Sequence, residues 1–269
     1  MSDSVNFYNS TYENFAAEIA AQIRRETVGE DIGQNSWLSA DEYRKFFQWL
    51  ELTPESNVLE IASGSGGPAL FIARSTGCRI TAIDNNENAI ATANRQAKEQ
   101  GLDMQVQFQY GDASMPLAFA DGTFDAIVCI DAINHLPGRL QVLKDWFRLL
   151  KPGGRMLFTD PITVTGLLTN EEIAIRSSIG FFLFTPPDVD TQLIREAGFE
   201  LLLREDATEN VAQISGRWYA ARAKREADLL KIEGEATYQG TQRFFAITHK
   251  LSSERRLSRF VFLARKPAS

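Results

Sequence analysis

The sequence contains few of the residues that carry metal, redox or nucleic-acid chemistry. Two cysteines and two histidines occur in 269 residues, and none is spaced like a zinc ligand, so we predict no metal site. Cys78 and Cys129 lie in apolar runs, which indicates reduced, buried thiols of a cytoplasmic protein. Positive charge is also scarce, because 28 Lys and Arg face 35 Asp and Glu, a net charge of −7. We therefore expect no binding to nucleic acid.

Long hydrophobic runs are missing as well. The first ten residues have neither the basic nor the apolar segment of a secretory signal. The apolar run at residues 181–184 is far too short to cross a membrane. Hydrophobic residues make up 44% and charged residues 23% of the chain, the usual balance of a globular protein. We expect a cytoplasmic monomer or homodimer that does not bind membranes.

From residue 57 onwards the sequence alternates short apolar segments with amphipathic ones. The pattern predicts strands at 58–61, 79–83, 106–110, 124–130 and 156–159, with helices beginning near 69, 87 and 140. We expect Pro152, Gly153 and Gly154 to end the third of these helices. Such alternation is typical of an α/β protein with a Rossmann-like, doubly wound parallel sheet.

The remaining segments are mostly helical and suggest a cap on this sheet. We predict helices at 191–197 and 241–249, a long helical stretch at 209–231, and strands at 199–204 and 257–264. His249 is expected at the surface or in a loop. The first fifty residues read as helical around a polar loop, residues 29–37. We expect one domain of residues 1–269, in which residues 1–50 and about 161–250 cap the carboxyl ends of the strands.

The strongest motif is V-L-E-I-A-S-G-S-G-G-P-A at residues 58–69, a strand that runs through a glycine loop into a helix. Gly64 and Gly66 permit a sharp turn and a close approach of a ligand to the backbone. With Ala69 they match the dinucleotide fingerprint, so a nicotinamide cofactor and another adenosine cofactor both remain open. Glu60, before the loop, would repel a pyrophosphate and attract an ammonium group, which favours S-adenosylmethionine (SAM).

Two aspartates follow the next strands. Asp84 could accept hydrogen bonds from both hydroxyls of a ribose, or it could cap the helix that follows. Asp112, with Ala113, could hold the amino group of an adenine, or it could be a turn residue beside Gly111.

The ordered set E-I-A-S-G-S-G-G, T-A-I-D-N-N, G-D-A-S, F-D-A-I-V-C-I-D-A-I-N-H-L-P and L-K-P-G-G-R resembles the motifs of class I SAM-dependent methyltransferases over residues 55–160. Ala62 stands where the family usually has glycine. The resemblance implies a sheet of seven mostly parallel strands with a last antiparallel strand. It also implies SAM contacts from Glu60, Ala62, Gly64, Ser65, Gly66, Asp84, Asn85, Asp112, Ala113 and Ile130.

The segment G-E-D-I-G-Q-N-S-W narrows the resemblance. It is similar in position and spacing to a segment of small-molecule methyltransferases, such as the tocopherol, coclaurine, sarcosine/dimethylglycine and phosphobase enzymes. Gly33, Gln34 and Asn35 replace its usual His-His-Gly. The resemblance implies that Gln34 and Trp37 also contact SAM, and that the acceptor is a small molecule.

His135 is the catalytic candidate. D-A-I-N-H, with Asp131 four residues earlier, resembles the phosphobase segment whose histidine acts in catalysis. A neutral imidazole can remove the proton of a hydroxyl or ammonium acceptor. Alternatively, His135 starts a helix and is bonded locally ahead of Pro137. A minority of the cap aromatics could line an apolar acceptor pocket that would also suit a cationic amine: Phe181, Phe182, Phe184, Trp218, Tyr219, Tyr238, Phe244 and Phe245.

Three functions remain open. We favour methyl transfer from SAM to a nitrogen or oxygen atom of a small-molecule acceptor. A nicotinamide-dependent oxidoreductase could use the same glycine loop, although the chain has no Tyr-x-x-x-Lys pair. The third is a non-catalytic SAM-binding protein.

Overall fold

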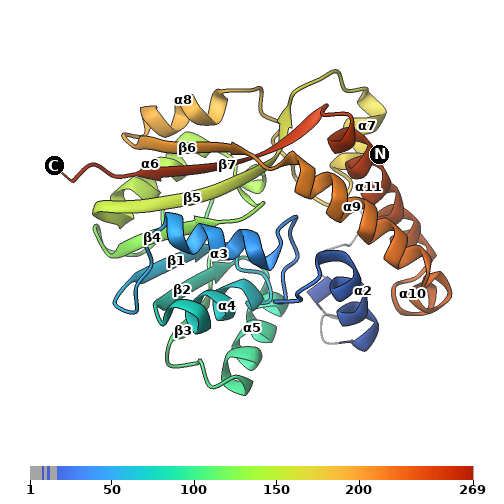
Figure 1. Ribbon diagram of the computed structural model, residues 1–269, viewed down its shortest axis with the longest axis horizontal. Helices are drawn as coiled ribbons and strands as arrows, with labels where there is room; N and C mark the ends of the chain where they lie inside the picture. The colour runs from blue at the N-terminus through green and yellow to red at the C-terminus, as the bar shows by residue number, and fades with distance from the viewer. Residues whose placement is uncertain (1–7, 9–10, 13–16, 269) are drawn as a thin grey trace.

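The computed structural model describes residue 8, residues 11 and 12, and residues 17–268. Within that part of the chain, seven strands form one sheet in the order β3-β2-β1-β4-β5-β7-β6 (Figure 1). Only β7 runs antiparallel to its neighbours β5 and β6, which confirms the predicted Rossmann-like sheet with an antiparallel last strand. The strands are β1 Asn57–Ile61, β2 Arg79–Asp84, β3 Val106–Tyr110, β4 Phe124–Cys129, β5 Leu150–Val164, β6 Glu200–Asp206 and β7 Leu257–Arg265.

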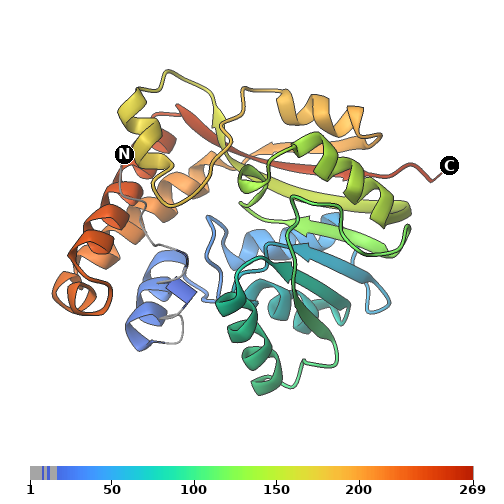
Figure 2. The same ribbon diagram turned by 180° about the vertical axis from the view of Figure 1, so that it is seen from behind.

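Helices cover both faces of the sheet (Figures 1 and 2). Alternate residues of β4 show why, since Ala126 and Val128 join one hydrophobic cluster and Ile127 and Cys129 join the other. A central strand buried on both faces is apolar throughout. The first cluster includes residues of α3 (Ala40–Trp49), α4 (Gly67–Thr76) and α5 (Glu87–Glu99); the second includes residues of α6 (Arg139–Leu149) and α8 (Val189–Glu196).

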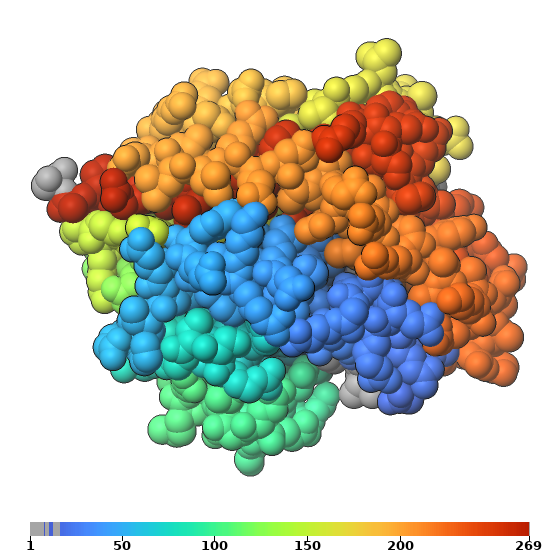
Figure 3. All heavy atoms as spheres, in the orientation of Figure 1, coloured from blue at the N-terminus to red at the C-terminus, as the bar shows by residue number. Residues whose placement is uncertain are grey.

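The remaining helices gather at one end of the sheet. They are α2 (Glu18–Val28), α7 (Asn170–Arg176), α9 (Thr208–Ala223), α10 (Glu226–Glu233) and α11 (Glu235–Ser253). In Figure 3 the blue surface around α2 meets the orange surface of α9 and α10 at this end. Aromatic side chains hold the group together: Trp218 stacks on Phe245 with ring centroids 5.4 Å apart.

The helical stretch predicted at 209–231 is helical but not continuous, because the structure divides it into α9 and α10. Arg225 leaves the helical conformation with φ −118° and ψ 22°, and its side chain binds the carbonyl oxygen of Ala221 and the carboxylate of Glu26. The turn buries Leu229 against Ile23 and Tyr238. His249 is exposed, as one of its two predicted alternatives has it, but it lies in α11 rather than in a loop, and its Nδ1 donates to the Ala212 carbonyl oxygen at 2.7 Å.

The fifth strand begins earlier than predicted. Leu150 already pairs with Phe124, and the next pair joins Ala126 to Arg155. Pro152, Gly153 and Gly154 therefore form a bulge inside β5 rather than a loop before it, and Gly153 has a left-handed φ of 80°. The strand extends to Val164 because it pairs with β7, a tertiary contact that local sequence does not reveal.

Candidate active site

Three cavities lie between the sheet and the cap. The strand-end cavity, bordered by the segments after β1 to β4, has an empty volume of about 1270 Å³ that includes open solvent. The loop cavity, beside the glycine loop, has about 410 Å³. The aromatic cavity, bordered by Trp37, Phe182, Trp218, Phe244 and Phe245, has about 460 Å³. Asn35 lines all three cavities, so they lie next to one another.

The glycine loop between β1 and α4 depends on its small residues. Gly64 and Gly66 have φ of 54° and 86°, the left-handed region that glycine tolerates best. A Cβ on Gly66 would lie 2.6 Å from the Phe108 ring, and one on Gly67 would lie 2.2 Å from the Ile32 oxygen. Gly64 borders the loop cavity, whereas Gly66 serves helix packing. Ala62 also adopts a left-handed φ of 58°, which costs roughly 1–2 kcal/mol for a residue other than glycine.

Glu60 lies in β1 below this loop and borders the loop cavity. Its side chain is only 3% exposed, and Oε2 has no hydrogen-bond partner among the described residues. Burial, and then the nearby charge of Asp84, raise the pKa of Glu60 to about 8. An ammonium group in the loop cavity would supply the missing partner and ionise the carboxyl group.

Asp84 ends β2 and faces the strand-end cavity. Its Oδ2 accepts from the Gly64 N–H at 2.8 Å and its Oδ1 from the Asn86 N–H at 2.9 Å. Burial raises its pKa, against the effect of these N–H groups. Helix α5 is capped by Asn86, whose side chain accepts from the Ala89 N–H, so the alternative that Asp84 caps the helix is wrong.

Asp112 is a turn residue, as one of the two predicted alternatives has it. Its Oδ1 accepts from both the N–H and the hydroxyl of Ser114, at 2.9 and 2.7 Å, which is a turn. Asp112 and Ala113 nevertheless both line the strand-end cavity.

The remaining predicted cofactor residues line different cavities. Ala62, Asn85 and Ile130 line the strand-end cavity, and Ser65 lines the loop cavity. Trp37 borders the aromatic cavity instead, stacked on Phe244 with centroids 6.2 Å apart.

Gln34 lies outside all three cavities. Its fully buried amide accepts from the Ile32 N–H and donates to the carbonyl oxygens of Glu30 and Leu38. The prediction that it reaches a cofactor is not supported by this placement, because its hydrogen bonds hold the loop itself.

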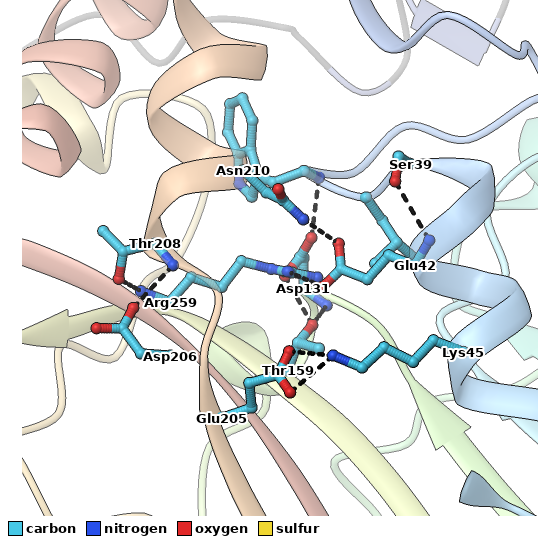
Figure 4. A network of polar contacts seen from close by, with 12 residues as sticks. Ser39, Glu42, Lys45, Asp131, Thr159, Glu205, Asp206, Thr208, Asn210 and Arg259 are labelled. Atoms are coloured by element: carbon cyan, nitrogen blue, oxygen red, sulfur yellow. Dashed lines mark hydrogen bonds and ion pairs between the residues drawn. The ribbon is translucent and has the colours of Figure 1, made fainter. Parts of the chain in front are cut away.

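Asp131 follows β4 in a left-handed conformation, with φ 52°. Its Oδ1 accepts from Arg259 Nε at 2.6 Å and from the Thr159 hydroxyl at 2.7 Å, and its Oδ2 accepts from the Trp37 N–H at 2.9 Å. Arg259 is fully buried and also binds Glu42 at 2.7 Å (Figure 4). The network ties β4, β7, α3 and the 29–37 loop together. Among the described residues, no hydrogen bond joins Asp131 to His135.

His135 is held by residues distant in sequence. Its Nδ1 lies 2.7 Å from the Phe181 carbonyl oxygen, which only accepts, so Nδ1 carries the proton. Nε2 then accepts from the Tyr8 hydroxyl at 3.0 Å. Burial lowers the pKa of His135, so the ring is neutral at pH 7. Tyr8 and His135 both line the strand-end and aromatic cavities.

Sequence reasoning missed several residues of this region. Tyr8, Tyr12 and Asn35 border the strand-end cavity, and Arg176 borders the aromatic cavity. Tyr12 packs over the glycine loop, because a Cβ on Gly64 would lie 3.0 Å from its hydroxyl. The four-residue spacing of Tyr8 and Tyr12 in a polar segment was the one available signal for the tyrosines. Among the predicted cap aromatics, Phe182, Trp218, Phe244 and Phe245 line the aromatic cavity.

The described residues contain no group of three His, Cys, Asp or Glu side chains arranged to hold a metal ion. None of the helices described here is both long enough and apolar enough to cross a membrane.

Fold and site together define a Rossmann-like α/β enzyme with a cavity at the carboxyl ends of its strands. Residues 58–154 match a family model described as a methyltransferase domain. The chain is 30% identical over 226 residues to 27-O-demethylrifamycin SV methyltransferase of Amycolatopsis mediterranei, covering 81% of this chain and 80% of that protein. The chain belongs to the class I SAM-dependent methyltransferases.

Two further comparisons agree. Sarcosine/dimethylglycine N-methyltransferase of Halorhodospira halochloris is 31% identical over 180 residues, which is 66% of this chain and 64% of that protein. Phosphoethanolamine N-methyltransferase 2 of Haemonchus contortus, solved in complex with SAM, shares the fold, with a TM-score of 0.80 at 18% identity over 98% of this chain and 60% of that one. In three curated relatives the match spans only 44–64% of the relative's length.

Proposed function

We propose that this protein transfers a methyl group from SAM to a nitrogen or oxygen atom of a small molecule. SAM occupies the strand-end and loop cavities, and the acceptor occupies the aromatic cavity. The observation that carries the proposal is the Tyr8–His135 pair, a proton acceptor on the wall shared by the strand-end and aromatic cavities. The relatives include an N-directed enzyme, an O-directed enzyme and sterol 24-C-methyltransferases, so they do not fix the acceptor atom. The proton acceptor beside the cavity is what supports a nitrogen or oxygen atom that must lose a proton.

The buried polar groups of the first two cavities fit SAM. Glu60, whose Oε2 lacks a partner among the described residues, binds the ammonium group. Asp84 accepts from the ribose hydroxyls, and Asp112 with Ala113 holds the adenine. The other contacts come from Ala62, Gly64, Ser65, Asn85 and Ile130. A nicotinamide cofactor fits less well, because the described residues that line the loop cavity include no lysine or arginine to bind its pyrophosphate.

Proton removal is the chemistry that the side chains contribute. SAM supplies an electrophilic methyl group, and the acceptor atom must approach it in line. The acceptor gives its proton to the Tyr8 oxygen as Tyr8 gives its own to His135 Nε2, which regenerates Tyr8 and leaves an imidazolium. His135 suits this task because burial lowers its pKa and keeps Nε2 unprotonated.

Asp131 acts as a positioning residue in this proposal. Arg259, Thr159 and the Trp37 N–H occupy its carboxylate, so it fixes the 29–37 loop against the end of β4. Residues 1–50 and about 161–250 form the cap of a single domain and shield the acceptor from water.

Partners and location complete the proposal. The acidic charge of −7 supports the absence of nucleic-acid partners. The two buried free cysteines support a cytoplasmic protein. We propose a monomer or homodimer.

Calorimetric titration with SAM and with NADH tests the cofactor. We expect 1:1 binding of SAM and no heat from NADH. Asp84→Ala weakens SAM binding by about 1–3 kcal/mol, whereas the control Asp125→Ala, at the opposite end of the sheet, leaves it unchanged. Binding of NADH without SAM, or an Asp84→Ala variant with parental affinity, would contradict the placement.

Proton release on binding tests Glu60. Its pKa of about 8 leaves it largely neutral at pH 7, and an ammonium partner ionises it. Titrations at pH 7 in two buffers of different ionisation heat are expected to show release of nearly one proton per SAM. In Glu60→Gln the buffer dependence disappears. Equal heats in both buffers for the parent protein would argue against an ammonium beside Glu60.

A further inference from the structure

Arg176 is a buried cation that forms no ion pair with the residues that the structure describes. It ends α7, is 1% exposed and borders the aromatic cavity. Its Nη1 is buried without a hydrogen-bond partner among the described residues. The other four buried arginines of the described residues all form ion pairs: Arg259 with Asp131 and Glu42, Arg139 with Asp160 and Asp190, Arg24 with Asp31, and Arg222 with Glu233. A lone buried charge is costly, so its presence calls for an explanation.

Aromatic rings compensate only part of this cost. The guanidinium carbon lies 4.8 Å from the ring centre of Phe182, 4.9 Å from that of Phe244 and 6.0 Å from that of Trp37. Cation–π contacts are weaker than a desolvated ion pair. Burial lowers the pKa of Arg176 to about 10, so the side chain remains a cation at neutral pH.

Other polar atoms of the same cavity also lack partners. Both side-chain polar atoms of the fully buried Asn134, and the Ser36 hydroxyl, have no hydrogen bond within the described part of the chain. Both residues line the aromatic cavity with Arg176. Among these unpaired atoms of the cavity, guanidinium, amide and hydroxyl donors outnumber the acceptor oxygens. Such a set of donors suits a ligand group with several acceptor oxygens.

We infer that the methyl acceptor carries an anionic group, a carboxylate or a phosphate, and that Arg176 binds this group in the aromatic cavity. The inference rests on the proposed function and narrows its acceptor class. It argues against a cationic amine in this cavity, because such a group would approach the Arg176 cation.

The position of Arg176 relates this anionic group to the reacting atom. The ring centre of Phe182 lies 4.8 Å from the guanidinium carbon of Arg176 and 4.6 Å from the ring centre of His135. The proposed anion site and the proton acceptor therefore both contact this one phenyl ring. A fourth cavity of about 700 Å³ among α2, α9, α10 and α11 shares Trp218 and Phe245 with the aromatic cavity, which leaves room for an apolar part of the acceptor.

Four matched probes test the inference on protein saturated with S-adenosylhomocysteine: phenylacetate, phenyl phosphate, phenylacetamide and phenethylamine. We expect at least one anion to bind about tenfold to a hundredfold more tightly than the amide and the amine, and the tighter anion identifies carboxylate or phosphate. Arg176→Met loses this preference and Arg176→Lys keeps part of it. The control Arg243→Met, exposed on α11, keeps all of it.

Thermal unfolding without ligand supplies an independent readout. A buried arginine that serves ligand binding destabilises the ligand-free protein, so Arg176→Met should melt at the parental temperature or above it. The preferred anion should raise the melting temperature of the parent but not that of the variant. Failure of both anions to bind more tightly than the amide, or a strongly destabilised Arg176→Met with unchanged anion binding, would overturn the inference. SAM titration of the same variant should match the parent; loss of SAM binding by the parent itself would instead refute the proposed function.

Discussion

At the residue scale, catalysis depends on which nitrogen of His135 is free to accept a proton. The Phe181 carbonyl oxygen fixes the proton on Nδ1, and Tyr8 occupies Nε2. Burial raises the pKa of Tyr8 to about 12, so Tyr8 donates rather than ionises. The sequence indicated His135 because it follows a central strand, but the residues that set its tautomer are 46 and 127 positions away and carry no local signal.

Variants at this pair should separate chemistry from binding. His135→Ala is expected to lower kcat by about a hundred- to ten-thousand-fold while the SAM affinity stays near the parental value. Tyr8→Phe should lower kcat as well, because the relay hydroxyl is lost. Steady-state kinetics with an acceptor found by screening provide the measurement. Near-parental kcat in His135→Ala would reduce His135 to a structural role.

The protonation state of His135 can be followed without an acceptor. The chain has two histidines, so nitrogen NMR of the imidazoles distinguishes them readily. Because burial lowers the pKa of His135 below its usual 6.5, we expect a midpoint below pH 6.5, and activity should fall only as the pH drops through that lower value. A midpoint above 6.5 would show that the ring is charged when it is needed as a base.

At the element scale, buried charges hold the sheet to its helices. Arg139 of α6 binds both Asp160 of β5 and Asp190 of α8, at 2.7 and 2.6 Å. Burial, followed by the charge of Asp160, raises the pKa of Asp190 to about 7. None of this could be predicted from sequence, because the three residues belong to elements whose contacts follow from tertiary packing.

This arrangement predicts how stability depends on pH. A carboxyl group with a raised pKa binds its proton more tightly in the folded state, so its stabilisation of the folded state is full below pH 3.8 and is lost as the pH rises through about 7. Between pH 5.5 and 7.5 the free energy of unfolding of the parent should fall by roughly 1–2 kcal/mol relative to that of Asp190→Asn. Urea unfolding at both pH values measures this, with the exposed Asp103→Asn as control. A constant difference between parent and Asp190→Asn would disprove the assignment.

The 29–37 loop is a segment that we expect cofactor binding to affect directly. Gln34 braces it internally, Asp131 accepts from the Trp37 N–H, and Asn35 lines all three cavities. We expect SAM to slow hydrogen exchange of the amides at Asn35 and Ser36, while β7, away from the cavities, serves as an internal reference. Identical exchange with and without SAM would remove this loop from the binding site.

At the scale of the whole molecule, the sequence predicted the sheet better than the cap. Strand and helix alternation placed Glu60, Asp84 and Asp112 at strand ends, and the structure puts all three beside the cavities. The cap, by contrast, is built from packing between distant helices. It brings Tyr8 and Arg176 to one cavity, and no periodicity or spacing in either segment predicts that they lie close together.

A crystal structure with S-adenosylhomocysteine tests the central proposal that these cavities form one methyl-transfer site. We predict the adenine beside Asp112, the ammonium group beside Glu60, and the sulfur at the opening to the aromatic cavity near Tyr8 and His135. There an acceptor atom could approach the methyl position to roughly 3–3.5 Å. A sulfur atom directed away from the aromatic cavity, or an adenine bound outside the strand-end cavity, would contradict the account.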